Sequence, residues 1–98
     1  ELLDPREGHP EIVILDMTRL IQLDTTGLEG LENLLDKLKK RGCTLIVCGL
    51  NSQPGSLLYR SGFIDHLGDD NVCPDLSGAL TRAYILLPSL MGSSDENY

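Results

Sequence analysis

The hydrophobic pattern of the chain changes period along its length. Residues 12–15 read Ile-Val-Ile-Leu and residues 44–48 read Thr-Leu-Ile-Val-Cys, which are short apolar runs rich in β-branched side chains. Runs of this length without polar alternation are typical of strands that are buried on both faces of a sheet. The sequence therefore predicts buried strands at residues 12–17 and 44–48.

Between these two runs, leucines recur at helical spacing. One face of the predicted helix carries Leu28, Leu31, Leu34, Leu35 and Leu38, and the opposite face carries mostly acids and lysines. This pattern predicts an amphipathic helix at residues 26–40 that is followed by Gly42, a usual residue beyond a helix end. Thr26 stands three residues before Glu29, the spacing of a capping box, so we expect the helix to begin at Thr26.

The second half of the chain repeats this alternation on a smaller scale. Residues 56–61 predict a short helix that is stopped by Gly62, and residues 71–73 predict a short edge strand. Pro74 and Asp75 then open a last helix, whose apolar residues at helical spacing are Leu76, Ala79, Leu80, Ala83, Tyr84 and Leu87. Strands that alternate with helices predict an α/β fold, a layered and mainly parallel sheet with helices packed on it.

The predicted sheet has few strands for a fold of this kind. A parallel sheet needs cover on both faces and neighbours at its edges, yet only two strong strands and one weak strand are found. We therefore expect residues 11–88 to form a domain that lacks its N-terminal strands, with a polar lead-in at residues 1–10 and a flexible tail at residues 89–98. An open sheet edge of this kind also predicts a homo-oligomer.

The composition of the chain disfavours some classes of binding partner. The chain has 98 residues and a net charge of −7, which disfavours nucleic acid and anionic membrane surfaces because both require clustered Lys and Arg. Three cysteines and two histidines, His9 and His66, show neither disulfide nor zinc spacing, so we expect reduced thiols, no metal and no cofactor. No apolar run approaches the length that spans a bilayer. The chain begins with Glu1, and we expect it to be cut from a longer polypeptide.

The segment Asp24-Thr25-Thr26-Gly27 lies between the first predicted strand and the predicted helix, and it places two hydroxyls at the start of that helix. One interpretation is an ordinary helix cap at Thr26. The other is a phosphoacceptor at Thr26, because free backbone N–H groups and the positive end of the helix dipole tolerate the charge of a phosphate. Both interpretations remain open at this stage.

Residues 13–18, 24–28, 41–49 and 57–63 together resemble the STAS domain. This domain is shared by the C-terminal cytoplasmic tails of sulfate-transporter-type anion permeases and by bacterial anti-sigma-factor antagonists, and the resemblance runs from about Ile12 to Leu87. In the antagonists the motif is Asp-Ser-Ser-Gly, and an anti-sigma kinase phosphorylates its second hydroxyl. The resemblance therefore implies Thr26 as the phosphoacceptor, with Thr25 as second choice. Residues 16–18 and 71–76 are more similar to the transporter branch.

The resemblance implies a non-enzymatic regulatory domain that binds a protein partner. Its partner-binding corner would comprise Asp24, Thr25, Thr26, Gly27 and Leu28. For the transporter branch the partner would be the membrane domain of the transporter, and the domain would be cytoplasmic without entering the bilayer. For the antagonist branch the partner would be an anti-sigma factor or kinase, and phosphorylation at Thr26 would act as the switch.

A different hypothesis makes the chain a small enzyme or phospho-receiver. Asp16 ends a predicted strand, where α/β folds place their chemistry, and Asp24 could supply a second carboxylate. However, no Lys or His follows a later strand, and no phosphate-binding glycine loop is present. Asp16 is better explained as a strand-end turn residue that bonds neighbouring backbone amides.

Overall fold

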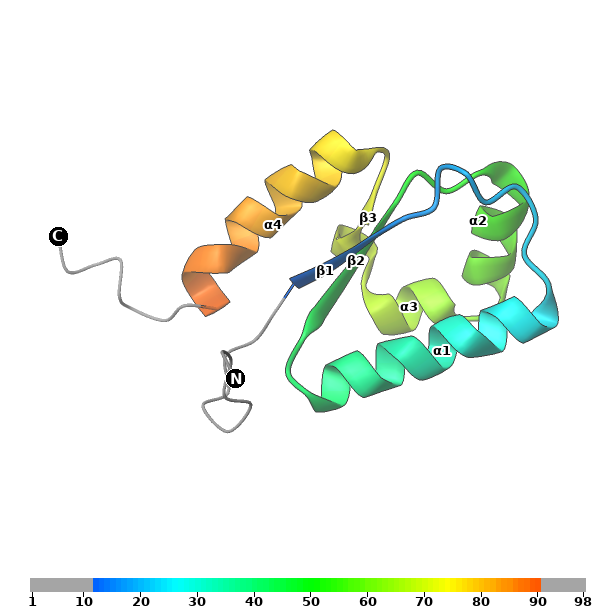
Figure 1. Cartoon of the computed structure of the whole chain (residues 1–98), viewed down its shortest axis with the longest axis horizontal. Helices are drawn as coiled ribbons and strands as arrows, with labels where there is room; N and C mark the ends of the chain where they lie inside the picture. The colour runs from blue at the N-terminus through cyan, green and yellow to red at the C-terminus, as the bar shows by residue number, and fades with distance from the viewer. Residues whose placement is uncertain (1–11, 91–98) are drawn as a thin grey trace, which may run out of the picture.

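The computed structural model describes residues 12–90. The predicted lead-in at residues 1–10, with His9, and residues 91–98 of the predicted tail lie outside this part of the chain. The described residues form a parallel sheet of three strands with helices on both faces (Figure 1). The predicted α/β class and the parallel arrangement are thereby confirmed.

The sheet consists of β1 (Ile12–Asp16), β2 (Thr44–Cys48) and β3 (Val72–Cys73), in the order β1-β2-β3. Ile14 is aligned with Ile46 across the β1–β2 pair, and Cys48 is aligned with Cys73 across the β2–β3 pair. The central strand β2 has four of its five residues buried, as its unbroken apolar run predicts. All three predicted strands are therefore present, and the first ends at Asp16 rather than at residue 17.

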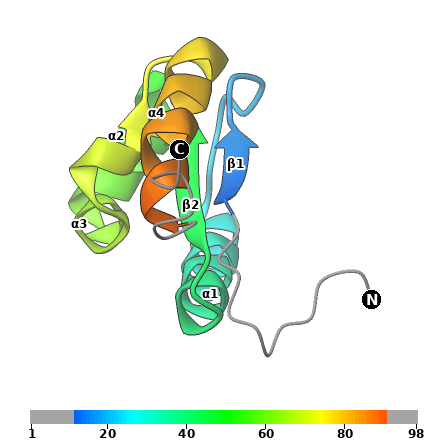
Figure 2. The ribbon, with the colours of Figure 1, turned by 90° about the vertical axis from the view of Figure 1, so that its left-hand side faces the viewer.

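Within residues 12–90, four α-helices and one 3-10 turn, η2 (Asp69–Asn71), connect and cover the strands. The helices are α1 (Thr25–Lys40), α2 (Ser52–Arg60), α3 (Phe63–Leu67) and α4 (Leu76–Leu90). Figure 1 shows α4 on one side of the sheet and the other three helices on the opposite side, and in Figure 2 α4 lies in front of β2. In α1, Leu35 is buried against the sheet, while Glu29 and Lys37 on the other face of the helix are exposed. The leucine periodicity predicts this orientation of the helix.

Two helices of the second half differ from the sequence prediction. The helix α2 begins at Ser52 rather than at residue 56, because Pro54 falls in its first turn, where a missing N–H costs no helical bond. Residues 63–67 form the short helix α3, which follows Gly62 in the left-handed conformation at φ 87°. The sequence pattern predicts no helix for this segment. The last predicted helix is present and continues to Leu90.

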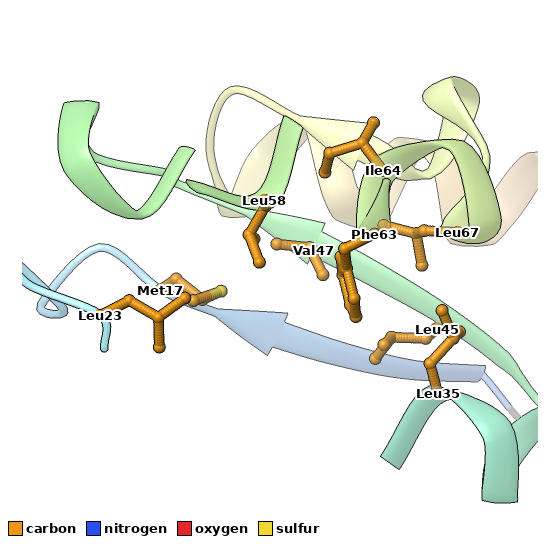
Figure 3. Packing of buried hydrophobic residues seen from close by; sticks show 9 residues of the cluster. All are labelled: Met17, Leu23, Leu35, Leu45, Val47, Leu58, Phe63, Ile64 and Leu67. Carbon is orange, nitrogen blue, oxygen red and sulfur yellow. The ribbon is translucent and has the colours of Figure 1, made fainter. Parts of the chain in front are cut away.

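The two faces of the sheet carry separate cores. The face under α1, α2 and α3 holds what we term the large core, and Phe63 lies at its centre with Val47 on one side and Leu45 on the other (Figure 3). Its buried members are Met17, Leu23, Leu35, Leu45, Val47, Leu58, Phe63, Ile64 and Leu67. The face under α4 holds the small core, which consists of Ile46, Cys48, Cys73 and Ala79.

Candidate functional site

The predicted corner lies at the start of α1, where its residues have distinct structural roles. Asp24 is the N-cap of the helix: its backbone is extended, and its Oδ1 accepts a hydrogen bond of 2.8 Å from the backbone N–H of Gly27. The carbonyl of Asp24 also accepts the N–H of Leu28 at 2.9 Å. Asp24 thus fixes the first turn from both its side chain and its backbone.

The capping box predicted for Thr26 and Glu29 is wrong. The helix begins one residue earlier, at Thr25, and Asp24 supplies the cap. A carboxylate at the N-cap satisfies a free N–H and also faces the positive end of the helix dipole, so Asp24 is favoured over a hydroxyl two residues later. Thr25 and Thr26 are exposed on the first turn of α1, and neither is needed to start the helix.

Gly27 and Leu28 connect this exposed turn to the large core. A Cβ atom at position 27 would lie 2.7 Å from Cδ1 of the buried Leu23, so a side chain there would require Leu23 to shift. Leu28 is partly buried and packs against the large core. The corner therefore presents two hydroxyls outward from a turn that is packed on its inner side.

Two amide side chains from the start of α2 hold the β1–α1 loop in place. Gln53 pairs with both backbone groups of Leu23: its Oε1 accepts the N–H at 2.7 Å, and its Nε2 donates to the carbonyl at 3.0 Å. Asn51 donates from Nδ2 to the carbonyls of Thr18 and Leu20, at 2.9 and 2.7 Å. We term these contacts the amide tether.

Sequence reasoning missed the amide tether. Its partners are about thirty positions apart, as in the Leu23–Gln53 pair at a separation of 30. The only local signal is the presence of two amide residues, Asn51 and Gln53, directly after a buried strand. Their position at the carboxyl edge of β2 brings them next to the loop that leaves the neighbouring strand β1.

Asp16 occupies a separate position at the end of β1. Its Oδ1 accepts hydrogen bonds from the hydroxyl of Thr18 and from the Thr18 backbone N–H, the latter at 3.0 Å. Both hydrogen bonds favour the ionised carboxylate, the one from the hydroxyl more than the one from the backbone. They hold the pKa of Asp16 below its ordinary value of 3.8. The carboxylate of Asp16 thus bonds a neighbouring backbone amide at the end of the strand, as the interpretation of Asp16 as a turn residue predicts.

Gly49, which directly follows β2, lies against this turn. It has a φ of 72°, and a Cβ atom there would overlap the Thr18 hydroxyl. The position therefore requires glycine for both its conformation and its close approach to Thr18.

The remaining candidate residues do not form a second functional site in the described part of the chain. In the part of the chain that the structure describes, no group of three or more His, Cys, Asp or Glu side chains is arranged to hold a metal. His66 lies on α3, with its Nε2 3.6 Å from Oδ1 of Asp36 on α1. Cys48 and Cys73 are buried in the small core, and burial raises the pKa of the Cys48 thiol. No described helix is long and apolar enough to cross a membrane.

Comparison with known proteins identifies the family. The model of the STAS domain family matches residues 2–79 of the chain. The chain belongs to the STAS domain family. Solved structures agree with this assignment: the sulfate transporter family protein from Wolinella succinogenes has a TM-score of 0.74 and 33% identity, over 78% of this chain and 62% of that one. The STAS domain of a SulP transporter from Vibrio cholerae has a TM-score of 0.75 and 31% identity, over 80% and 61%.

Curated relatives of this STAS domain include sulfate transporters. The putative sulfate transporter YvdB of Bacillus subtilis is 31% identical over 67 residues, which are 68% of this chain and 13% of that protein. Sulfate transporter 1.2 of Arabidopsis thaliana is 34% identical over 82 residues, with 68% and 12% covered. The STAS domain thus matches only about an eighth of the length of these two relatives.

Proposed function

We propose that this STAS domain is a non-enzymatic regulatory domain of a sulfate-type anion transporter and that it binds its protein partner through the corner Asp24–Leu28. The observation that carries the proposal is the construction of the corner. Thr25 and Thr26 are exposed, while Asp24, Gly27 and the amide tether hold the turn from beneath. A preorganised, exposed turn loses little conformational freedom on binding.

The partner we propose is the membrane domain of the transporter polypeptide, with the STAS domain on the cytoplasmic side. Two facts support this choice. The curated relatives are sulfate transporters of which the matched region is a small part. The chain is also acidic, with a net charge of −7, which favours a protein surface over anionic lipid.

A phosphate on Thr26 would act as a release switch. Thr26 is the second residue of α1, so the helix dipole and free N–H groups of the first turn offset part of the added charge within the domain. The partner surface lacks this compensation and would face up to two new negative charges beside the carboxylate of Asp24. Binding would therefore weaken while the fold remains intact.

Calorimetric titration of the STAS domain with the membrane domain of its transporter tests this proposal. We expect Thr26→Asp to weaken binding at least about tenfold, and the uncharged, nearly isosteric Thr26→Val to have a much smaller effect. Lys40→Ala, at the far end of the same helix, should change affinity less than about threefold because an isolated exposed charge contributes little. The thermal midpoint and the far-UV spectrum report on folding in each variant.

The same titration can contradict the proposal. Equal binding by wild type and Thr26→Asp, together with a loss at Lys40→Ala, would move the interaction site to the C-terminal end of α1. Phosphorylation of the wild-type domain, with Thr26→Val as the variant that cannot be modified there, then tests the switch separately from the docking surface.

A further inference from the structure

Cys48 and Cys73 are neighbours in the small core. They end the strands β2 and β3 and are aligned with each other across this parallel pair. Both side chains belong to the small core, so both point to the same face of the sheet. The backbone holds this register next to them, since the N–H of Gly49 donates to the carbonyl of Cys73 at 3.2 Å. Pairing of the two strands therefore fixes two thiols next to each other.

The alignment is compatible with a disulfide bond within one chain. Neighbouring strands lie about 4.8 Å apart, and the two Cα atoms of a disulfide are usually about 4.4–6.8 Å apart. The third cysteine, Cys43, directly precedes β2, whereas Cys48 ends it. The extended strand between them separates their Cα atoms by roughly 16 Å, which is too far for a bridge. The register thus selects Cys48 and Cys73 as the pair that can be joined.

The cover over these two thiols is thin at the first turn of α4. Ala79 of this helix is buried in the same small core, and a Cβ atom at position 78 would lie 3.4 Å from Cβ of Cys73. Cys48 is completely buried, whereas Cys73 is 8% exposed. Cys73 also lines a surface hollow of about 380 Å³, which it shares with Tyr59 of α2. Cys73 is therefore the thiol of the pair that a small molecule reaches first.

We propose that Cys48 and Cys73 form a modification site, at which hydrogen peroxide or a related hydroperoxide converts the two thiols into a reversible disulfide. Cys73 attacks the peroxide, the O–O bond breaks, and the released hydroxide takes up the thiol proton as water, leaving a sulfenic acid on Cys73. Cys48 then attacks this sulfur, and a second water leaves as the S–S bond forms. Two thiols and one hydrogen peroxide thus give one disulfide and two waters.

The surroundings of Cys48 fit the second step better than the first. Burial, and next the charge of Asp16, raises the pKa of the Cys48 thiol, so little thiolate is present to attack a peroxide in solution. A sulfenic acid on the aligned Cys73 is a different target, because its attack by Cys48 takes place within one molecule. We therefore expect the disulfide to form slowly, at a rate set by the access of peroxide to Cys73.

The bond would fix the shortest strand of the sheet. The strand β3 has two residues, and α4 follows it closely in the chain. A disulfide between Cys48 and Cys73 closes the loop that contains α2, α3 and η2. Because this closure restricts the unfolded chain, the oxidised domain should melt at least about 5 °C above the reduced one. The site is distinct from the corner at the start of α1, so the inference is independent of the proposed transporter function.

Treatment of the dilute chain with hydrogen peroxide tests the proposal, in a Cys43→Ser background that removes the third thiol. We expect an intramolecular product that is lighter by two hydrogen atoms, and a non-reducing digest in which the peptide with Cys48 is joined to the peptide with Cys73. Dithiothreitol should restore both thiols. The matched control adds Cys48→Ala, in which the isolated Cys73 should proceed to a sulfinic acid and the melting temperature should not rise.

Hydrogen exchange gives a local readout of the same bond. The amide of Gly49 is bonded to the carbonyl of Cys73, so its exchange should slow at least about tenfold when the disulfide forms. The amide of Gly27, which is bonded to the N-cap carboxylate of Asp24 outside the closed loop, should exchange at a nearly unchanged rate. The far-UV spectrum should be the same in the oxidised and reduced domains.

Two results would overturn the proposal. In the first, peroxide oxidises Cys43 of the wild-type chain while Cys48 and Cys73 both remain thiols, which would mean that α4 shields the pair completely. In the second, the disulfide forms only in the urea-unfolded chain, or the oxidised domain melts below the reduced one. Either observation would show that the folded register of β2 and β3 does not accommodate the bond.

Discussion

The face of the sheet beneath α1, α2 and α3 holds nine buried hydrophobic residues, whereas the face beneath α4 holds four. The first face is closed by three helices with leucines and a phenylalanine, and Phe63 fills its centre (Figure 3). The second is closed by a single helix whose contact residues include the small Ala79 and Ala83. The same sheet therefore has one face that is complete within the described chain and one that is thinly covered.

This difference suggests a division of roles. The complete face supports the corner, because Leu28 packs on the large core and the amide tether anchors the loop before α1. A docking surface built there can stay rigid. The thin face instead leaves apolar side chains of α4 exposed, and a single helix covers its buried cysteines. The predictions below measure how far the two faces differ.

Substitution of two neighbouring residues of β2 tests the difference between the two faces directly, and it has the largest expected effect on stability. Leu45 points into the large core and Ile46 into the small core, and both are almost completely buried. We expect Leu45→Ala to lower the free energy of unfolding by about 4 kcal/mol and Ile46→Ala by about 2.5 kcal/mol. The cavity beneath three packed helices cannot collapse, whereas α4 alone can move toward the sheet. Urea denaturation of both variants gives the two values.

The order of the two values is what matters in this test. A larger loss for Ile46→Ala than for Leu45→Ala would show that α4 closes its face as tightly as the other three helices do.

The amide tether should have the next largest effect. Gln53→Ala removes the partners of the Leu23 N–H and carbonyl, which are partly buried, so we expect a loss of about 2 kcal/mol. Gln53→Glu keeps the acceptor and loses the donor, and should fall between the alanine variant and wild type. Hydrogen exchange at the Leu23 amide provides a local readout. Unchanged exchange in Gln53→Ala would mean that the Asn51 hydrogen bonds and packing hold the loop without Gln53.

The parts of the fold that the sequence predicts well are those with local signals. The apolar run of β2 and the leucine spacing of α1 each lie within one segment, and both elements are present as predicted. The start of α2 was mispredicted because Pro54 and Gly55 are typical of loops, although here both are buried inside the helix. A proline in the first turn carries no signal that separates a helix start from a turn.

The candidate site was only partly predictable for the same reason. The sequence indicates a helix start near Asp24, Thr25 and Thr26, but it does not say which of them is the cap. That choice depends on the single residue at which the backbone turns helical. The contacts of Asn51 and Gln53 with the β1–α1 loop arise only after β1 and β2 pair. No local pattern predicts them.

The cap of α1 gives a smaller effect with a clear internal control. We expect Asp24→Ala to cost about 1 kcal/mol, since it leaves the Gly27 N–H without its acceptor, while Asp24→Asn retains a capping oxygen and costs less. Thr26→Ala should change stability by less than about 0.5 kcal/mol, because Thr26 is an exposed position inside the first turn. Thermal denaturation of the three variants compares them. A Thr26→Ala variant that is less stable than Asp24→Ala would restore Thr26 as the cap.

The smallest expected effect concerns Asp16, which lies at the carboxyl end of β1 and outside both cores. Hydrogen bonds from Thr18, first from its hydroxyl and then from its backbone N–H, lower the pKa of Asp16 from 3.8. Because the folded-state pKa is the lower one, the unfolded chain binds the proton more readily in acid. The contribution to stability is therefore complete above the unfolded pKa and is lost as pH falls through the folded pKa.

The matched pair Thr18→Val and Thr18→Ser isolates this contribution. Thr18→Val removes the hydroxyl donor, so the melting temperature should fall less steeply with acid than in wild type below about pH 4, the region in which a carboxylate with a lowered pKa takes up its proton. Thr18→Ser keeps the donor and should follow wild type. Above this range the acid dependence of all three proteins should be parallel, since Asp16 is ionised in both states. If the melting temperatures of wild type and Thr18→Val decreased identically in acid, the turn that joins Asp16 to Thr18 would not be maintained in solution.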